Sequence, residues 1–132
     1  MSDQAQSDEI RKFLDDYTRA FDAREAVAIA MLYHVPSVTM RGDGSAQCFQ
    51  SRGELQQFFQ GVADGYHQEA NLGPGRYHGL TIQPIGARSV LVTLEWEMVR
   101  TDGSIVREWR QSYNLVRVDG RWQIFVSTFH RE

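Results

Sequence analysis

Cysteine is nearly absent from this sequence, and so are long apolar segments. Cys48 is the only cysteine, so the chain forms no intramolecular disulfide, and a single thiol fits a reducing compartment. No apolar run approaches the ~20 residues that a membrane-spanning helix needs. Residues 1–7 are polar and lack the apolar core of a signal peptide. We therefore expect a cytoplasmic protein with no membrane contact.

Basic clusters and metal-ligand spacings are also missing. The 14 Lys and Arg residues are scattered among 17 Asp and Glu residues, and the net charge of −3 argues against a nucleic-acid partner. His34, His67 and His78 are far apart, and there is neither a His-x-His nor a Cys-x2-Cys motif. We therefore expect no metal site, no cofactor and no nucleic-acid interface.

The N-terminal half of the sequence is typical of helices with a pair of short strands. The length of 132 residues suits a single domain, which we expect over 8–132 after a disordered tail over 1–7. Pro36 stops one helix, and Ser51 and Glu54 have the spacing of a capping box at the start of another. The expected helices run from Ser7 or Asp8 to Asp22 or Ala23, over about 25–33 and from Ser51, and the expected strands over 37–40 and 46–49.

Two Asp-Gly pairs predict that residues 76–130 form four antiparallel strands. Asp-Gly between alternating apolar residues is the strongest short-range signal for a two-residue hairpin loop. Asp102-Gly103 and Asp119-Gly120 then fix the register of the last three strands. The expected pairs are Thr101 with Ser104, Met98 with Arg107, Val90 with Leu115, Arg117 with Trp122, Tyr113 with Val126 and Trp109 with His130. The preceding strand has two possible registers, with either Tyr77 and Thr81 or His78, Leu80 and Ile82 inward.

Side chains alternate between the two faces of a strand, so this register assigns each residue of the four strands to a face. One face combines an apolar wall with a few polar groups, which is the composition of a small-ligand pocket. Its candidate ligand-binding residues are Leu94, Trp96, Arg107, Trp109, Gln111, Tyr113 and Thr128. The order of helices and strands predicts an α+β domain whose helices cover one face of the sheet.

Two residues are candidates for catalysis. His130 lies on the same face, where it is either a general base near neutral pH or a residue at a fraying strand end. Tyr17 either directs its hydroxyl into the pocket or is a core aromatic residue. The polar neighbour Arg107 either binds a carboxylate or stays solvated near its strand end.

The opposite face of the strands carries more apolar residues than contact with bare solvent favours. Val106, Val116, Phe125 and Phe129 lie there in the expected register. Because such a surface favours a two-fold arrangement, we expect a homodimer through this outer face.

Several segments of the chain resemble the nuclear transport factor 2-like superfamily, which includes SnoaL-like polyketide cyclases and ketosteroid isomerases. These segments are Phe13-x3-Tyr17-x3-Phe21-Asp22, Ala28–His34, Ser51–Glu54 and Asp119–Ile124, and bacterial members also carry Trp96, Trp109 and Ser112-Tyr113-x-Leu115 at similar places. The resemblance covers about residues 8–130. It implies a strongly curved, mixed and mostly antiparallel six-stranded sheet around three helices, with a ligand or active site in the mouth of this cone.

The resemblance to ketosteroid isomerases is incomplete. Tyr17 and Asp22 reproduce the spacing of a Tyr and an Asp on the first helix of those enzymes. However, Met40 or Arg41 stands where they carry the proton-shuttling Asp, and neither side chain can abstract a proton. The departure excludes that mechanism.

We therefore expect a small-molecule-binding domain of this fold with a largely apolar and aromatic pocket. One alternative is a SnoaL-like cyclase, isomerase or dehydratase-type enzyme, in which His130 moves a proton while Tyr17 or Gln111 stabilises an enolate oxygen. Another alternative is a dimeric interaction module whose cone is filled by its own side chains.

Overall fold

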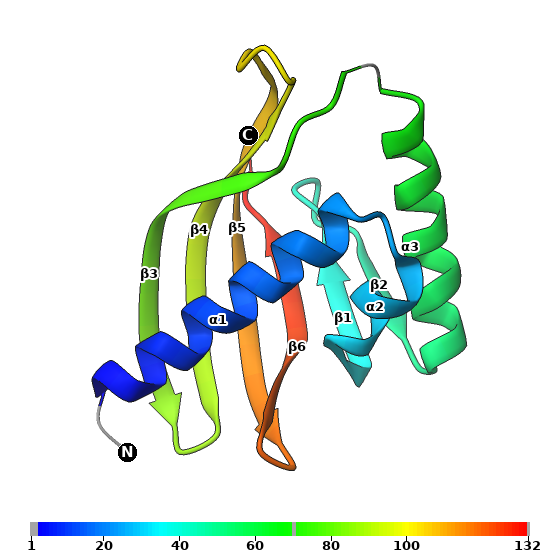
Figure 1. The fold of residues 1–132 in the computed structure, drawn as a ribbon. Coiled ribbons are helices and arrows are strands. Elements are labelled where there is room, and N and C mark those ends of the chain that lie inside the picture. The colour runs from blue at the N-terminus through cyan, green and yellow to red at the C-terminus, as the bar shows by residue number, and fades with distance from the viewer. Residues whose placement is uncertain (1–2, 70, 132) are drawn as a thin grey trace.

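A curved six-stranded sheet with three helices on one face forms the fold (Figure 1). The computed structural model describes residues 3–69 and 71–131. The helices are α1 (Asp3–Asp22), α2 (Ala26–Met31) and α3 (Arg52–His67). The strands are β1 (Tyr33–Met40), β2 (Ala46–Phe49), β3 (Arg76–Gly86), β4 (Ser89–Val99), β5 (Ile105–Val118) and β6 (Arg121–Phe129). Their order in the sheet is β2-β1-β6-β5-β4-β3, with β1 and β6 parallel and the other neighbours antiparallel.

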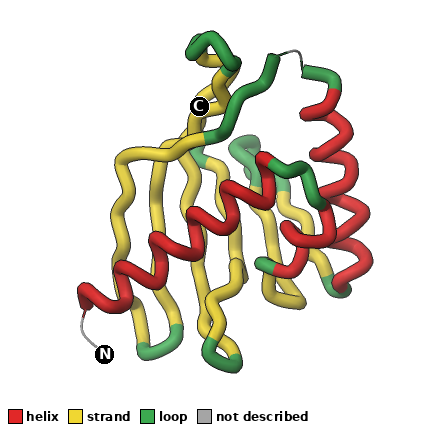
Figure 2. The backbone as a smooth tube through the Cα atoms, viewed as in Figure 1, coloured by secondary structure: helices red, strands yellow, loops and turns green. Residues whose placement is uncertain are grey.

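The helices form a second layer over the concave face of the sheet. Helix α1 runs obliquely across the long strands, whereas α2 and α3 lie together near β1 and β2 (Figure 2). This arrangement confirms the predicted α+β class and the mostly antiparallel, open sheet. Within the described residues, none of the helices has the length and apolar character needed to cross a membrane.

Helix α1 begins at Asp3, inside the segment that the sequence predicted as a disordered tail. Residues 3–7 contain no helix breaker, and Ala and Gln have high helix propensity. Gln4 also donates a hydrogen bond to the Asp8 carboxylate one turn further on (2.9 Å). The tail prediction is therefore wrong for residues 3–7, while residues 1–2 lie outside the described part of the chain.

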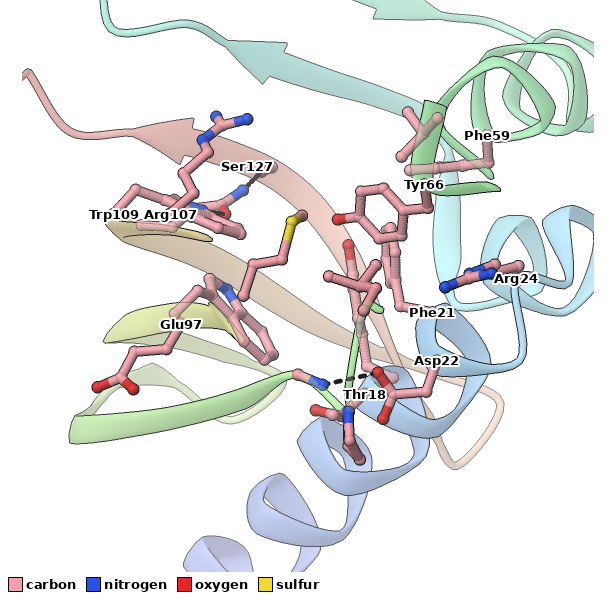
Figure 3. Close-up of a pocket in the computed structure, with 18 of the residues that line it drawn as sticks. Thr18, Phe21, Asp22, Arg24, Phe59, Tyr66, Glu97, Arg107, Trp109 and Ser127 are labelled. Carbon is pink, nitrogen blue, oxygen red and sulfur yellow. Dashed lines mark hydrogen bonds between the residues drawn. The ribbon is translucent and has the colours of Figure 1, made fainter. Parts of the chain in front are cut away.

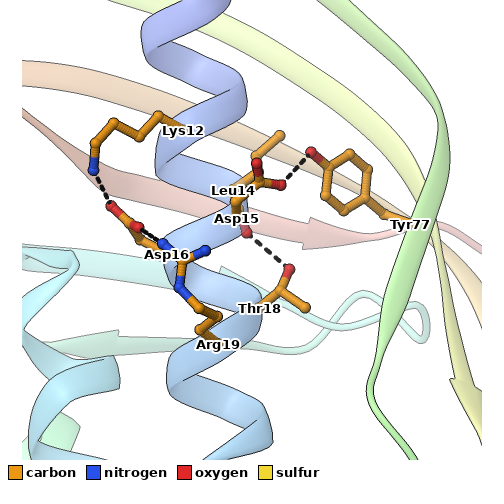
Figure 4. Close-up of polar contacts among 7 residues, drawn as sticks. All are labelled: Lys12, Leu14, Asp15, Asp16, Thr18, Arg19 and Tyr77. Atoms are coloured by element: carbon orange, nitrogen blue, oxygen red, sulfur yellow. Dashed lines mark hydrogen bonds and ion pairs between the residues drawn. The ribbon is translucent and has the colours of Figure 1, made fainter.

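Polar contacts on the flanks of α1 accompany its docking on the sheet (Figure 4). Tyr77 of β3 donates a hydrogen bond to the Asp15 carboxylate over 3.0 Å. Partial burial, reinforced by this carboxylate, raises the pKa of Tyr77 to about 12, so the phenol remains a donor at neutral pH. Asp16 pairs with Lys12 and Arg19 on the exposed side. These exposed pairs lie within α1 and contribute only ~0–1 kcal/mol each, whereas the Tyr77 contact joins α1 to the edge strand β3.

The capping box at the start of α3 is present with one difference. The Ser51 hydroxyl accepts a hydrogen bond from the backbone N–H of Glu54 (3.1 Å), as the spacing predicts. The Glu54 carboxylate reaches back to the backbone N–H of Gln50 (3.0 Å) rather than to that of Ser51. Both contacts satisfy backbone donors near the helix start, which explains why α3 begins where it does.

The β4–β5 hairpin keeps the predicted register through a different loop. Arg100 donates to the carbonyl of Ser104 (2.8 Å), which makes a three-residue loop of Thr101–Gly103 rather than the predicted two-residue loop. An irregularity between Met98 and Val99 compensates for the extra residue. The pairs from Met98 with Arg107 to Val90 with Leu115 are consequently those expected. Trp96 and Trp109 face each other across the two strands.

The β5–β6 hairpin follows the predicted register only up to an inserted residue. Asp119 and Gly120 have φ values of 51° and 77°, as a two-residue type I′ loop requires. Leu115 pairs with Ile124, as predicted, but Asn114 then pairs with Val126, so that Phe125 is an extra residue in β6. The rest of β6 is thereby displaced by one position.

This β-bulge reverses the faces of the last residues of β6. Tyr113 pairs with Ser127 and Gln111 with Phe129, which places Ser127 and Phe129 on the concave face. Thr128, opposite Ser112, lies on the outer face. The predicted inward position of Thr128 and His130 is therefore wrong, because a one-residue insertion exchanges the two faces of a strand.

Strand β3 combines the two registers that the sequence left open. Tyr77 pairs with Trp96, as the first register predicts, whereas Ile82 pairs with Val92, as the second predicts. The change occurs between His78 and Thr81, next to Gly79, whose φ of 66° favours glycine. Tyr77, Leu80 and Ile82 all pack against the core.

The core lies between α1, α2, α3 and the concave face of the sheet. Leu94 of β4 is fully buried there. Other aliphatic and aromatic members of this core are Ile10, Phe13, Leu14, Ile29, Phe49, Leu55, Val90, Val92, Leu115, Trp122 and Ile124.

Candidate functional site

A pocket of about 510 Å³ opens between α1, α3 and the concave face of the sheet (Figure 3). The loop of residues 72–75, which connects α3 to β3, forms part of its edge. Ten aromatic side chains make up much of its wall: Tyr17, Phe21, Tyr33, Phe58, Phe59, Tyr66, Trp96, Trp109, Tyr113 and Phe129. A pocket with this many aromatic rings in its wall is suited to the binding of apolar, planar molecules.

Four buried aromatic residues, Tyr17, Tyr33, Trp96 and Tyr113, form the floor of the pocket. The hydroxyls of Tyr17 and Tyr33 share a hydrogen bond of 2.5 Å, and Trp96 Nε1 donates to the Tyr113 hydroxyl over 2.8 Å. Burial raises the pKa of all three phenols above the ordinary value. The floor is therefore neutral at physiological pH, and its polar atoms bind one another.

A second hydrogen-bonded chain orients the wall on the strand side. Trp109 Nε1 donates to Gln111 Oε1 (2.9 Å), and Gln111 Nε2 donates to the Ser127 hydroxyl (2.6 Å). The Arg107 guanidinium lies 4.9 Å from the centre of the Trp109 ring, within cation–π distance. The indole of Trp109 is thus fixed by its own N–H and by a cation on one side.

The mouth of the pocket, where it opens to solvent, carries polar side chains: Asp22, Arg24, Tyr66, Glu97 and Arg107. Asp22 accepts a hydrogen bond from the backbone N–H of Gly75 (2.9 Å), and partial burial raises the pKa of its carboxyl. Glu97 pairs with Arg76 (2.7 Å) and His78 (2.9 Å), and its carboxylate is directed away from the pocket (Figure 3). Hydrogen bonding to Arg76 lowers the pKa of Glu97, which therefore stays ionised.

Arg24 is held at the mouth by an unusual backbone conformation. Its φ of 56° lies in the left-handed region, and it follows the last turn of α1. Its N–H donates to the carbonyl of Phe21 (2.9 Å), and the N–H of Glu25 donates to that of Ala20 (3.2 Å). This is the Schellman pattern, in which glycine usually occupies the left-handed position, and a β-carbon there costs about 1 kcal/mol. The side chain of Arg24 lies beside the pocket, with Nη1 3.3 Å from His67 Nδ1.

Most of the residues predicted to line the site are brought together by the fold. Tyr17, Trp96, Arg107, Trp109, Gln111 and Tyr113 all line the pocket. Leu94 does not, because it is fully buried in the core next to Trp96 on β4. Thr128 does not, because the β6 bulge turns it to the outer face.

The predicted catalytic residue His130 also lies outside the pocket. Its Nε2 is 2.7 Å from the hydroxyl of Ser112, which in turn shares a hydrogen bond of 2.7 Å with Thr93. Thr93 and Ser112 alternate with pocket and core residues along β4 and β5, so this chain of polar groups lies on the outer face. His130 therefore has no access to a ligand in the pocket.

Sequence reasoning missed several residues of the site. Phe129 was placed on the outer face and instead lines the pocket with Ser127, because the bulge at Phe125 leaves no clear signal in the sequence. Tyr66 belongs to the apolar stripe that Leu55, Phe58, Phe59 and Val62 form along α3, but such a stripe does not distinguish a pocket residue from a core residue. The position of Arg24 depends on the turn after α1, which the helical periodicity does not specify.

The predicted outer-face residues other than Phe129 stay outside the pocket. Val106, Val116 and Phe125 are partly buried and do not line it. The Phe125 ring packs edge-on against His34, with 5.4 Å between the ring centres. Among residues 3–69 and 71–131, no group of three His, Cys, Asp or Glu side chains is placed to hold a metal ion.

Comparisons with known proteins agree with the fold described above. The model of a family described as NTF2-like protein (DUF6841) matches residues 8–132. Aln2 from a Streptomyces species superimposes with a TM-score of 0.78 at 12% identity, covering 99% of this chain and 93% of that one. A domain of unknown function with a cystatin-like fold from Nostoc punctiforme gives a TM-score of 0.76 at 15% identity, covering 99% and 80%.

A further solved structure has a length close to that of this chain. An NTF-2 like protein of unknown function from Shewanella oneidensis gives a TM-score of 0.74 at 14% identity and covers 95% of this chain and 98% of its own. No curated protein matches the sequence. At identities this low, the superpositions show a shared fold alone, and the family model confirms the resemblance that the sequence motifs indicated.

Proposed function

The chain belongs to the NTF2-like protein family DUF6841, and from this premise we propose that it is a cytoplasmic protein that binds a small, largely apolar and aromatic molecule. The observation that carries the proposal is the pocket of about 510 Å³ among ten aromatic side chains. A concave, largely apolar pocket with a few polar groups is the usual form of a small-molecule site. The volume of this pocket lies within the range of small-molecule sites, roughly 300–1,000 Å³.

The polar groups of the pocket support binding more than proton transfer. The hydroxyl of Tyr17 is bonded to that of Tyr33, and burial keeps its pKa high. Gln111 uses its carbonyl for Trp109 and its amide for Ser127. The general base of the alternative enzyme hypothesis, His130, lies on the other side of the sheet. What remains inside is a rigid aromatic space with a polar mouth.

Calorimetric titration with 2-naphthamide, a neutral and planar aromatic probe, tests this proposal. We expect saturable binding to the wild-type protein and at least tenfold weaker binding to Val62→Trp, because Val62 lines the pocket and the larger ring would fill it. The matched control is Val27→Trp on α2, where the residue is 60% exposed and does not line the pocket. Absence of binding to the wild-type chain, or equal binding to both variants, would contradict the proposal.

We also propose that a second copy of the chain covers the outer face of the sheet. The helices all lie on the concave face, so the partly exposed apolar residues of the outer face, including Leu91, Val116 and Val126, have no cover within one copy. Opposite charges also occur there, since Glu95 faces Arg110 across β4 and β5. A two-fold arrangement brings such a face against itself.

Size-exclusion chromatography with light scattering tests the dimer. Val116→Asp places a charge on the proposed contact and is expected to give monomers. Val27→Asp, at an exposed position of α2 on the other side of the sheet, is the control and is expected to leave the dimer unchanged. A monomeric wild-type protein would refute the proposal.

A further inference from the structure

The charges at the mouth do not balance. Glu97 is engaged by Arg76 and His78 and points away from the pocket (Figure 3). Asp22 is the remaining carboxylate of the mouth, and the cation that acts on it is Arg24, whereas Arg107 lies on the other side of Tyr66 (Figure 3). Arg107 forms no ion pair with any described residue, and its guanidinium lies over the face of Trp109. The mouth therefore has about one positive charge more than its own side chains neutralise.

A hydrogen-bond donor lies among these cations. The hydroxyl of Tyr66 extends from α3 across the pocket toward β5, the strand that carries Arg107 and Trp109 (Figure 3). It makes no hydrogen bond to any residue that the structure describes. Burial raises the pKa of this phenol, while the charge of Arg107 opposes the shift and Asp22 adds to it, so Tyr66 is neutral and able to donate.

The backbone at Arg24 adds an independent observation. The left-handed position after α1 is one that glycine fills without strain, yet this chain has Arg there, and its guanidinium lies at the mouth. Strain retained at one residue of a pocket is typical of sites where the side chain has a role. This guanidinium contacts the ring of His67, which carries no negative charge to compensate it.

From these observations we propose that the mouth binds the carboxylate of an aromatic carboxylic acid whose ring lies against the aromatic wall. Arg107 and Arg24 supply the positive charge, and the Tyr66 hydroxyl donates a hydrogen bond to the carboxylate. A monoanion restores the charge balance of two cations and one carboxylate, whereas a dianionic phosphate would reverse it. The proposal rests on the proposed function and specifies the class of ligand.

The matched pair 2-naphthoate and 2-naphthamide tests the proposal, because the two probes share ring and shape and differ in charge. In calorimetric titrations at low salt, we expect the wild-type protein to bind the naphthoate at least tenfold more tightly than the amide. Added salt should reduce this ratio, since the mouth is open to solvent.

Three variants locate the effect. Arg107→Met should reduce the naphthoate preference to about onefold while the amide binds as before, and Tyr66→Phe should reduce it by about threefold to tenfold. Arg121→Met removes an exposed cation at the opposite end of the sheet and should leave the preference unchanged. A circular dichroism spectrum and melting curve for each variant verify that the fold is retained.

The possible outcomes separate the two proposals. Equal binding of the two probes to the wild-type protein, or an unchanged preference in Arg107→Met, would overturn the carboxylate site while the aromatic pocket stands. Absence of binding by both probes would overturn the carboxylate site together with the proposed function.

Discussion

The floor and the mouth of the pocket differ in how their polar groups are bonded. In the floor, Tyr17 is bonded to Tyr33 and Trp96 to Tyr113, all of them buried and neutral. In the mouth, the Arg107 guanidinium and the Tyr66 hydroxyl have neither an ion-pair nor a hydrogen-bond partner among the residues that the structure describes, and Arg107 contacts only the face of Trp109. The contrast indicates that floor residues contribute mainly to stability, whereas mouth residues contribute mainly to recognition. Substitutions in the two regions should therefore separate melting temperature from affinity.

The largest loss of stability is expected in the core next to the floor. Leu94→Ala removes a fully buried side chain and should lower the free energy of unfolding by about 2–5 kcal/mol. Because Leu94 does not line the pocket, the folded fraction should bind 2-naphthamide as the wild type does. Urea denaturation combined with calorimetry measures both quantities, and Leu91→Ala on the outer face of the same strand is the milder control. A large loss of affinity with little loss of stability would show that Leu94 contacts the ligand.

A smaller loss of stability is expected within the floor. Tyr113→Phe removes the hydroxyl that accepts the hydrogen bond of Trp96 and leaves a buried N–H without a partner. The free energy of unfolding should fall by about 1–3 kcal/mol. Chemical denaturation followed by tryptophan fluorescence measures this change. Unaltered stability would mean that the floor hydrogen bonds are dispensable, and the contrast with the mouth would fail.

The mouth should show the opposite behaviour at Arg24. Arg24→Gly relieves the left-handed backbone strain, so the melting temperature should stay constant or rise, corresponding to a gain of up to about 1 kcal/mol. The affinity for 2-naphthoate should fall at the same time, while that for 2-naphthamide should be unchanged. Arg24→Lys, which retains both the charge and the strain, is the control. A destabilised glycine variant would show that the Arg24 side chain serves the fold.

The smallest effect concerns Asp22 and depends on pH. Its pKa is raised by partial burial, so the folded state holds the proton more tightly than the unfolded state, and the stability that this proton provides is lost as the pH rises through the raised value. Asp22→Asn resembles the protonated carboxyl. The variant should therefore melt at the wild-type temperature at low pH and slightly above it at pH 7. A difference that grows toward low pH would reverse the sign of this argument.

The fold and most of the residues in the floor of the pocket could be predicted from the sequence. Apolar spacing predicts α1 and α3, and the two Asp-Gly pairs predict the long hairpins, including the opposition of Trp96 and Trp109. These features depend on interactions between neighbours in the chain, which a short window of sequence describes. The extra loop residue at Thr101–Gly103 was not predicted. The predicted pairs of β4 and β5 are nevertheless correct from Met98 onward, because a compensating irregularity restores the register.

The parts that escaped prediction depend on single-residue irregularities. The bulge at Phe125 exchanged His130 and Thr128 for Phe129 and Ser127, and the left-handed Arg24 brought a guanidinium to the mouth. Phe125 has no neighbouring Gly or Pro that would indicate a break in the alternation of side chains between the two faces of the strand. Such features are decided by packing between distant elements, which a strand or helix pattern does not contain.

The bulge in β6 has a consequence for how chains of this fold diversify. If β6 paired without this bulge at unchanged length, Asn114 would face Phe125 and every later residue of the strand would lie on the opposite face, exchanging the Phe129 ring for the His130 imidazole on the concave side. The chemistry available to a bound molecule would change from inert to proton-accepting without any replacement of the residues concerned. In this architecture, the presence or absence of one β-bulge decides which side chains of the last strand can reach a bound molecule.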